Sequence, residues 1–351
     1  MTLEDKIKNE IRNRGHITVD NFMEIALFDK DGGYYIKKNP IGINSDFITS
    51  PEISVLFGEI LGAFIVKQIQ DNLQRYDRIN LIELGAGKGT LLNDILNLIS
   101  KFPDIYQKIN CYILDINPIL VENQRKILIN HINIVNWINS LQEIGGPSPH
   151  IYIANEFFDA LPVKQFLKTD SGIRERVVML DKGEKLVFSA IATLPPKIIV
   201  SDSEDHEEGA IMEYSPLSVQ FMQEISENLL KHKGFAVIID YGYSGFITGD
   251  SLQSVAKHGF NDIFNNIGDA DITAHVNFRM LYNVALNAGL ESLYLYNQSE
   301  FLKSMGIIQR AEILAKKMDE KQKIDLFMRV NRLVNLHEMG ELFKFMIAEK
   351  F

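Results

Sequence analysis

A glycine-rich segment follows a short apolar run and carries residues that could do chemistry. Residues 79–90 read INLIELGAGKGT, in which Glu83 ends the apolar run and glycines stand at positions 85, 87 and 89. The β-type residues before Glu83 and the helical pattern from Thr90 predict a strand, a glycine turn and a helix. Glycines let a backbone approach a ligand closely, and a helix N-terminus offers unpaired N–H groups. The turn therefore predicts a nucleotide-like ligand.

Three known types of glycine-rich turn could give this pattern. A Walker A loop requires Gly-Lys followed by Ser or Thr, but Lys88 is followed by Gly89. The dinucleotide fingerprint G-x-G-x-x-G fails by one residue, because the third glycine stands at position 89 instead of 90. The remaining form, E-x-G-x-G-x-G, is that of class I methyltransferases that use S-adenosylmethionine (SAM), where Glu83 would orient the methionine amine. A tight turn without a ligand stays the plain alternative.

A second acidic residue ends the next apolar run. Residues 111–114 read CYIL, and Asp115 follows them, with Pro118 placed to begin a helix. In a doubly wound sheet, ligands bind at the carboxyl ends of the strands, where a carboxylate can accept both ribose hydroxyls. Asp115 therefore predicts a ribose contact. Capping of the following helix is the alternative.

Two later segments add candidates at the same sheet edge. Trp137, the only tryptophan, ends a predicted third strand and could stack on an adenine ring, although packing is the ordinary role of such a residue. The fourth strand leads into Asn155, Glu156, two phenylalanines and Asp159. Methyl transfer from a sulfonium needs an aligned acceptor that loses a proton, and paired carboxylates suit a guanidinium acceptor. Helix capping by Asn155 or Asp159 is the alternative.

A histidine beside acidic residues lies further along the chain. His275 follows Asp271 by four residues, and a neutral histidine can accept a proton near neutral pH. A structural histidine bound to backbone groups is equally compatible with the sequence. His275 is therefore a further catalytic candidate.

The alternation of strands and helices predicts a parallel α/β sheet. We expect strands at 79–84, 111–114, 132–137, 151–154, 235–240 and 290–296, and helices at 3–13, 19–27, 53–69, 90–102, 119–130 and 216–231. Residues 176–180 and 185–190 are expected to form an inserted hairpin, and residues 299–351 to be largely helical. The predicted divisions are a helical and lid region (1–76), a cofactor-binding core (77–162), an inserted substrate subdomain (163–210), the remainder of the core (211–298) and a C-terminal helical region (299–351).

Composition limits the classes of function. The chain has 351 residues, 46% of them hydrophobic, and a formal net charge of −10, which argues against a general nucleic-acid binder. Cys111 is the only cysteine, so no disulfide framework or cysteine metal cluster is expected. Residues 1–14 mix acidic and basic side chains, and no apolar run is long enough for a membrane span. We therefore expect a cytoplasmic protein without direct membrane insertion, and no metal site; the oligomeric state is left open.

Several segments together resemble one known family. They are DFITSPEISVLFGEILG, ELGAGKGT, ANEFFDALPVKQF, IIDYG, GDADITAHVNF and MGELFK, which occur in this order over nearly the whole chain. They look like the MidA family of SAM-dependent protein arginine methyltransferases, which are assembly factors of respiratory complex I. The resemblance implies a class I, Rossmann-like methyltransferase sheet with an N-terminal helical and lid region and an inserted β-hairpin subdomain.

The resemblance also implies roles for individual residues. Glu83, Gly85 and Gly87, with Gly89 in the same turn, would hold the methionine end of SAM, and Asp115 its ribose. Ser50, Pro51 and Glu52 would help to form a lid. Asn155, Glu156 and Asp159 would line the acceptor site, with Asn155 also near the cofactor.

The function expected from this reading is transfer of a methyl group from SAM to an arginine of a protein, with a core subunit of respiratory complex I as a candidate substrate. Two alternatives remain open at this stage. One is a methyltransferase of the same fold that acts on a small molecule. The other is an assembly chaperone that binds SAM, or only its partner, without catalysis.

Overall fold

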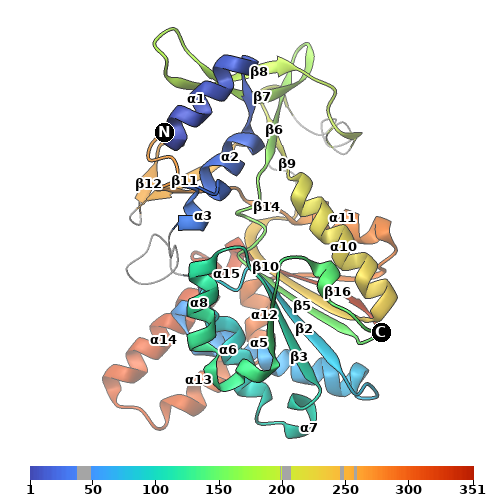
Figure 1. The fold of residues 1–351 in the computed structure, drawn as a ribbon. Coiled ribbons are helices and arrows are strands. Elements are labelled where there is room, and N and C mark those ends of the chain that lie inside the picture. The colour runs from blue at the N-terminus through green and yellow to red at the C-terminus, as the bar shows by residue number, and fades with distance from the viewer. Residues whose placement is uncertain (38–48, 198, 200–206, 246–248, 257–258) are drawn as a thin grey trace.

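The computed structural model describes residues 1–37, 49–197, 199, 207–245, 249–256 and 259–351. Residues 38–48, the middle of the predicted lid loop, lie outside the described residues. The described part of the chain forms two lobes, a large mixed sheet covered by helices and a smaller lobe above it in Figure 1.

Apart from the short β14, the large sheet in the described part of the chain contains five parallel strands and two antiparallel ones. Its order is β15-β16-β10-β5-β2-β3-β4, and β14 (Val276–Asn277) pairs with the end of β10. The parallel strands are β2 (Ile79–Leu84), β3 (Ile109–Leu114), β4 (Val135–Ile138), β5 (His150–Asn155) and β10 (Gly234–Tyr243). The antiparallel strands are β15 (Ser292–Asn297) and β16 (Phe343–Lys350). This mostly parallel arrangement confirms the predicted α/β class.

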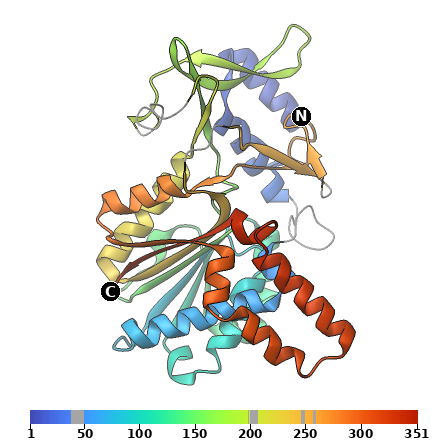
Figure 2. The same cartoon turned by 180° about the vertical axis from the view of Figure 1, so that it is seen from behind.

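Both faces of the sheet are buried, so its central strands are largely apolar. All six residues of β2 are buried, and alternate side chains enter different cores: Leu81 packs on one side and Ile82 on the other. Helices α5 (Val55–Gln68) and α6 (Thr90–Ile99) pack against the first face with α12 (Gln298–Ser304), α13 (Ile307–Ala315) and α14 (Glu320–Val334). Helices α10 (Pro216–His232) and α11 (Phe278–Ala288) cover the second face. Figure 2 shows α12–α14 beside α5.

The smaller part, which we call the upper lobe, is built from segments far apart in the sequence. It contains α1 (Leu3–Arg14), α2 (Val19–Phe28), α3 (Tyr34–Lys37) and two small sheets. One sheet joins β1 (Ile17–Thr18), β6 (Lys164–Thr169), β7 (Gly172–Leu180), β8 (Leu186–Ala192) and β9 (Ile211–Tyr214); the other joins β11 (Gln253–Ala256), β12 (Gly259–Asn261) and β13 (Asp271–Thr273). Most of their apolar residues form one core, in which Phe22, Val178 and Ile272 are buried together, while Phe166 and Met212 belong to a smaller cluster.

Three local predictions differ from the structure. The helix predicted at 53–69 is preceded by a separate turn of helix, α4 (Ser50–Ile53), because Ser54 is extended and its hydroxyl caps the N-terminus of α5. The third strand begins at Val135 instead of residue 132, after a short 3-10 helix. The prediction of a largely helical C-terminus is wrong for β16, whose apolar residues pair on both sides with β10 and β15. A short apolar run suits either structure, and the long-range pairing decides.

The sequence predicts no membrane insertion, and the length and apolar character of the helices bear on this prediction. Among the helices that the structure describes, none is long and apolar enough to cross a membrane.

Candidate functional site

The glycine turn after β2 requires glycine at three positions. Gly85, Gly87 and Gly89 have φ values of +63°, +54° and +89°, a backbone region that other residues rarely adopt. A Cβ at Gly85 would lie 2.8 Å from the Phe157 ring, and one at Gly89 would lie 3.3 Å from Cγ of Gln124. The turn therefore brings the start of α6 close to the loop after β5 and to helix α8 (Pro118–Ile127).

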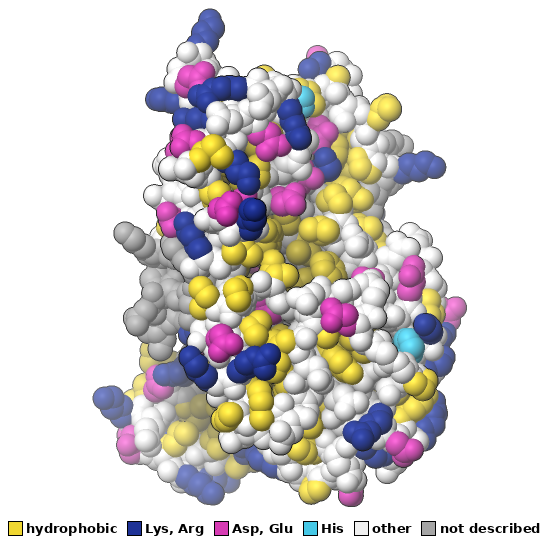
Figure 3. All heavy atoms as spheres, viewed as in Figure 1, with side chains coloured by type: hydrophobic (Ala, Val, Ile, Leu, Met, Phe, Trp, Pro, Cys, Tyr) yellow, Lys and Arg dark blue, Asp and Glu magenta, His cyan; other side chains and the backbone are white. Residues whose placement is uncertain are grey.

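Two adjoining cavities lie at this turn and share Gly85, Gly87 and Glu156. The larger one, of about 390 Å³, lies between the carboxyl ends of the strands and the upper lobe. Its lining includes Glu24, Phe28, Tyr35, Leu114, Asp115, Ile116, Asn117, Asn139, Phe157, Leu161, Pro162, Leu217 and Phe221. The smaller one, of about 50 Å³, is lined by Thr49, Pro51, Glu52, Glu83, Ala86, Lys88, Thr90, Leu91 and Asn155. Figure 3 shows hydrophobic side chains gathered between the two lobes on the face drawn.

Three buried oxygen atoms have no hydrogen-bond partner in the described structure, two on residues that line the smaller cavity and one on Ser50, which stands between the lining residues Thr49 and Pro51. They are Oε2 of Glu83, Oδ1 of Asn155 and Oγ of Ser50. Glu83 is only 2% exposed, and burial, with the charge of Asp115 as a smaller cause, raises the pKa of its carboxyl to about 8. Buried acceptors without donors are rare and costly in proteins. This group of acceptors suits a bound cationic donor.

Asp115 lines the larger cavity and is held by two donors. Its Oδ1 accepts a bond from the Asn117 backbone N–H (2.9 Å), and its Oδ2 accepts one from Nε2 of Gln124 (2.7 Å). Burial raises the pKa of Asp115, whereas these bonds oppose the rise. Each carboxylate oxygen has a second lone pair, so the group can still accept bonds from a ligand.

Trp137, for which the sequence suggested a contact with adenine, contacts Gln124 and Arg125 in the structure. It is not among the residues that line the two cavities. Its indole Nε1 donates to Oε1 of Gln124 (2.8 Å), and the guanidinium of Arg125 lies 4.0 Å from its ring centroid. This geometry favours a role in orienting Gln124. Asn139, two residues further on, lines the larger cavity instead.

The loop after β5 begins with a strained residue. Glu156 has a φ of +51°, which non-glycine residues seldom adopt and which often marks a functional site. Its Oε1 accepts bonds from the Ser50 backbone N–H (3.1 Å) and from Nδ2 of Asn155 (3.3 Å). Burial, followed by the charge of Asp159, raises the pKa of Glu156 to about 8.

Two more carboxyl groups lie directly behind Glu156. Asp159 accepts a bond from the Tyr241 hydroxyl (2.6 Å), and burial raises its pKa to about 6. Asp240, at 0% exposure, accepts bonds from the backbone N–H groups of Phe158 (3.0 Å) and Asp159 (3.2 Å). Burial, and then the charges of Asp159 and Glu156, raise the pKa of Asp240 well above its ordinary value. We call Glu156, Asp159 and Asp240 the carboxyl cluster.

The carboxyl cluster has no basic counterpart in the described part of the chain. None of its three members forms an ion pair with any described Lys, Arg or His side chain. Among the described residues, no group of three or more His, Cys, Asp or Glu side chains is arranged to hold a metal ion. Without a cation beside them these carboxyl groups favour their protonated forms, as their raised pKa values indicate, and a bound cation would favour ionisation.

The predicted lid residues lie over the smaller cavity. Pro51 and Glu52 line it, and Glu52 accepts a bond from the Thr90 hydroxyl (2.6 Å) while lying 3.5 Å from Nζ of Lys88. The backbone of Ser50 contacts Glu156, as described above. Helix α4 is thus tied both to the glycine turn and to the loop after β5.

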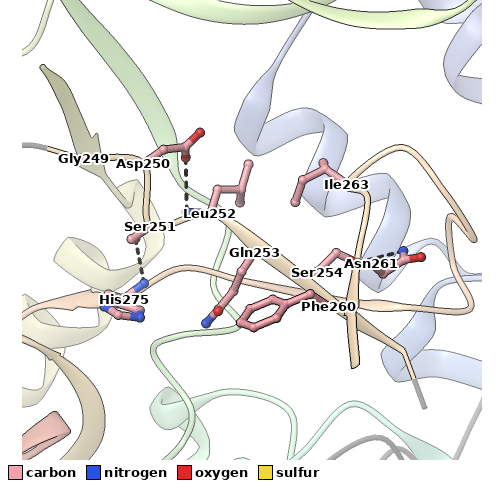
Figure 4. Close-up of a pocket in the computed structure, with 10 residues that line it drawn as sticks. All are labelled: Gly249, Asp250, Ser251, Leu252, Gln253, Ser254, Phe260, Asn261, Ile263 and His275. Atoms are coloured by element: carbon pink, nitrogen blue, oxygen red, sulfur yellow. Dashed lines mark hydrogen bonds between the residues drawn. The ribbon is translucent and has the colours of Figure 1, made fainter. Parts of the chain in front are cut away.

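His275 lies away from both cavities. It lines a separate groove of about 490 Å³, where its backbone N–H donates to Oγ of Ser251 (2.8 Å), as Figure 4 shows. Its ring meets that of Tyr241 edge-on at 5.4 Å, and burial lowers its pKa. The ring of His275 therefore contacts Tyr241, whose hydroxyl donates to Asp159.

Several residues at the site were not predicted from the sequence. Asp240 directly follows a buried apolar run within β10, and an acid after such a run is the same signal that identified Glu83 and Asp115. Gln124 and Tyr35 carry no such signal. Tyr35 comes from the upper lobe, where its hydroxyl donates to Oδ2 of Asp271 (2.8 Å) and its backbone oxygen accepts from Nδ2 of Asn117 (2.6 Å).

Comparisons with known proteins relate this chain to methyltransferases. A family model described as "Putative S-adenosyl-L-methionine-dependent methyltransferase" matches residues 60–295. The chain is 33% identical to the bovine protein arginine methyltransferase NDUFAF7, mitochondrial, over 96% of this chain and 81% of that one. The human protein of the same name is 31% identical over 96% of this chain and 80% of that one.

A solved structure is also similar along nearly the whole chain. A crystal structure from Burkholderia thailandensis, bound to S-adenosyl-homocysteine, has a TM-score of 0.88 and 26% identity and covers 99% of this chain and 92% of its own. The class I methyltransferase fold and the SAM cofactor predicted from the sequence are therefore confirmed. The chain belongs to this family of SAM-dependent methyltransferases.

Proposed function

We propose that this methyltransferase acts on the guanidino group of an arginine in a protein substrate. The observation that carries the proposal is the carboxyl cluster, which lies beside the cofactor cavities without a basic partner among the described residues. A planar guanidinium pairs with carboxylates through directed hydrogen bonds. The relatives named protein arginine methyltransferases support the same acceptor.

The cofactor residues follow from the acceptors described above. Glu83 and Asn155 would accept bonds from the amine of the methionine moiety, since each has a buried oxygen without a partner. Gly85 and Gly87 would allow the cofactor to approach the backbone, and Gly89 would keep the turn close to α8. Asp115 would accept bonds from the ribose hydroxyls. When bound, SAM supplies an electrophilic methyl group on a sulfonium.

The acceptor residues would hold and deprotonate the arginine. Glu156, at the boundary between both cavities, and Asp159 behind it would orient the guanidinium for attack by a nitrogen lone pair. The new N–C bond forms as the C–S bond breaks, and the nitrogen gives up one proton. Glu156, with a pKa of about 8, would accept that proton from its ionised form, which a bound guanidinium favours.

Neighbouring residues would support this arrangement. Helix α4, which includes Ser50, Pro51 and Glu52, would keep water from the methionine end of the cofactor, because it is tied to Thr90 and Glu156. His275 would act indirectly, because its ring packs against Tyr241 and the Tyr241 hydroxyl donates to Asp159.

The candidate protein substrate is a core subunit of respiratory complex I, as the family resemblance suggested. The curated relatives are named as mitochondrial. A cytoplasmic location of this chain stays a prediction that fractionation of the source cells can check.

The test uses the purified protein, radiolabelled SAM and each purified core subunit of complex I. We expect label in methylated arginine of one subunit, identified after hydrolysis and by mass spectrometry. The Glu156→Gln variant should lose most transfer while it retains S-adenosylhomocysteine binding. The matched control is Glu175→Gln, a substitution of a buried glutamate on β7 that lines neither cavity. Transfer to lysine or to a small molecule, or full activity of Glu156→Gln, would refute the proposal.

A further inference from the structure

A fully buried glutamine joins three parts of the cofactor cleft. Gln124 on α8 is 0% exposed, and its amide contacts the glycine turn, the acid after β3 and the indole on β4. Nε2 donates to the carbonyl oxygen of Gly87 (2.7 Å) and to Oδ2 of Asp115 (2.7 Å). Oε1 accepts from Nε1 of Trp137 (2.8 Å). We propose that Gln124 is a positioning residue that fixes Asp115 and the glycine turn for recognition of the cofactor ribose.

The three contacts allow only one orientation of the amide. The indole N–H of Trp137 can only donate, whereas the Gly87 carbonyl and a carboxylate can only accept. The oxygen of Gln124 must therefore face Trp137, and both hydrogens of its nitrogen are then directed to Gly87 and Asp115. Trp137 sets the direction of the amide, and the amide sets the direction of the carboxylate.

The backbone at the turn lets Gln124 come this close. A Cβ at Gly89 would lie 3.3 Å from Cγ and 3.4 Å from Cα of Gln124, which is tighter than usual contacts. Gly89 lines neither cavity, so its role is to leave space for the side chain of Gln124, which donates to the Gly87 carbonyl oxygen. This packing distinguishes Gly89 from Gly85 and Gly87, which line both.

Asp115 is held at both oxygens before any ligand binds. The Asn117 N–H holds Oδ1 and Gln124 holds Oδ2, so the plane of the carboxylate is set from the protein side. A preorganised acceptor loses less conformational freedom when a ligand binds. This inference rests on the proposed contact between Asp115 and the ribose, and it adds that ribose recognition depends on Gln124.

The experiment compares two ligands by calorimetry on the intact protein. One is S-adenosylhomocysteine, and the other is its analogue without the ribose 2′- and 3′-hydroxyls. In Gln124→Met, which keeps the size of the side chain, we expect S-adenosylhomocysteine to bind about tenfold more weakly or worse. Binding of the analogue should change much less. A merely structural role for Gln124 would weaken both ligands equally.

Two further variants define the comparison. Gln298→Met is the matched control, because Gln298 is also 0% exposed and its Nε2 donates to the Leu333 carbonyl oxygen (2.9 Å). Gln298 lines neither cavity. This substitution should leave both affinities unchanged. Trp137→Phe removes the donor that orients the amide and keeps an aromatic ring beside Arg125, so it should weaken S-adenosylhomocysteine selectively and have no added effect in a Gln124→Met background.

The outcomes separate this inference from the proposed function. Equal weakening of both ligands in Gln124→Met and in Trp137→Phe, or no weakening at all, would overturn the positioning role. If Gln124→Met does not fold, Trp137→Phe alone decides between these results. Asp115→Ala tests the underlying assignment, since it should abolish discrimination between the two ligands. If Asp115→Ala still discriminates, the ribose contact is misassigned and the inference falls with it.

Discussion

Glu83 is a buried carboxyl group with one oxygen that lacks a partner and a pKa of about 8. Below pH 8 this group is largely protonated in the free protein, whereas a ligand amine requires its ionised form. We therefore expect S-adenosylhomocysteine affinity to rise from pH 6 to about 8, by at most about tenfold per pH unit for one released proton. Calorimetry across this range measures the slope.

The Glu83→Gln variant should lose this slope and bind weakly at every pH. Asp94→Asn serves as the control, because Asp94 is a buried acid with a pKa raised to about 6 by burial and lines neither cavity. An unchanged slope in Glu83→Gln would show that another group releases the proton on binding.

Asp240 supports the loop after β5 through bonds from the backbone N–H groups of Phe158, Asp159 and Tyr241. An asparagine would direct its amide hydrogens toward some of these donors. Asp240→Asn should lower the free energy of unfolding by about 1–3 kcal/mol, the cost of leaving buried donors unpaired. Urea unfolding measures the change.

The exposed Asp181 gives a matched comparison for Asp240. It also accepts two backbone bonds, from Gly183 (2.7 Å) and Lys185 (2.8 Å), but it lies in a solvated turn. Water can replace the lost bonds there, so Asp181→Asn should cost clearly less. Equal costs for the two variants would contradict the supporting role given to Asp240.

The strand, glycine turn and helix formed by β2 and α6 depend on Gly85. An alanine there would be strained at a φ of +63° and would place its Cβ 2.8 Å from Cδ2 of Phe157. Gly209→Ala is the control, since Gly209 has a φ of +89° with nothing within 4 Å of an added Cβ. We expect Gly85→Ala to be more destabilising by about 1–3 kcal/mol, the usual cost of overpacking.

Thermal unfolding and S-adenosylhomocysteine titration check this difference. Gly85→Ala should also weaken ligand binding, because Phe157 lines the larger cavity and must move. Equal stability of the two variants would mean that the Phe157 ring moves aside at little cost.

Prediction of elements succeeded where the signal is local. The turn at 85–89 could be predicted because glycine best suits the three positions with positive φ, 85, 87 and 89, in a strand-to-helix connection. The strand β16 was missed because its pairing partners lie in β10 and β15, tens of residues away in the sequence. Its apolar residues alone are compatible with a helix or a strand.

The molecule as a whole gathers several acids with raised pKa values where the upper lobe meets the sheet. Glu83 and Glu156 both have pKa values of about 8, against an ordinary value of 4.5. For such groups the folded state binds more protons than the unfolded one. Their contribution to stability is complete below pH 4.5 and is lost as the pH rises through 8.

We therefore expect the free energy of unfolding, without ligand, to fall between pH 6.5 and 8.5. The buried histidines do not disturb this window, because their pKa values are lowered below 6.5. Urea unfolding at several pH values measures the trend. A double variant, Glu83→Gln with Glu156→Gln, should flatten it, and a wild-type stability that rises over this window would contradict the assigned protonation states.

The sequence alone was enough to predict those site residues whose signal lies in their neighbours along the chain. Glycines that tolerate positive φ, and acids that end apolar strands, identified the turn, Glu83, Asp115 and the loop at 155–159, because these signals depend only on neighbouring residues. The carboxyl ends of parallel strands meet at one edge, so these residues were expected to lie together.

Other parts of the site depend on contacts between distant segments. Tyr241 and Asp159 are 82 residues apart, and Tyr35 and Asp271 are 236 residues apart. Gln124 can donate to the glycine turn only because α8 packs against that turn, and the indole N–H of Trp137 donates to the same amide. No local pattern encodes such contacts, because they arise when the upper lobe and the helices bury their apolar faces together. Packing therefore assembled the carboxyl cluster and placed His275 outside the cavities.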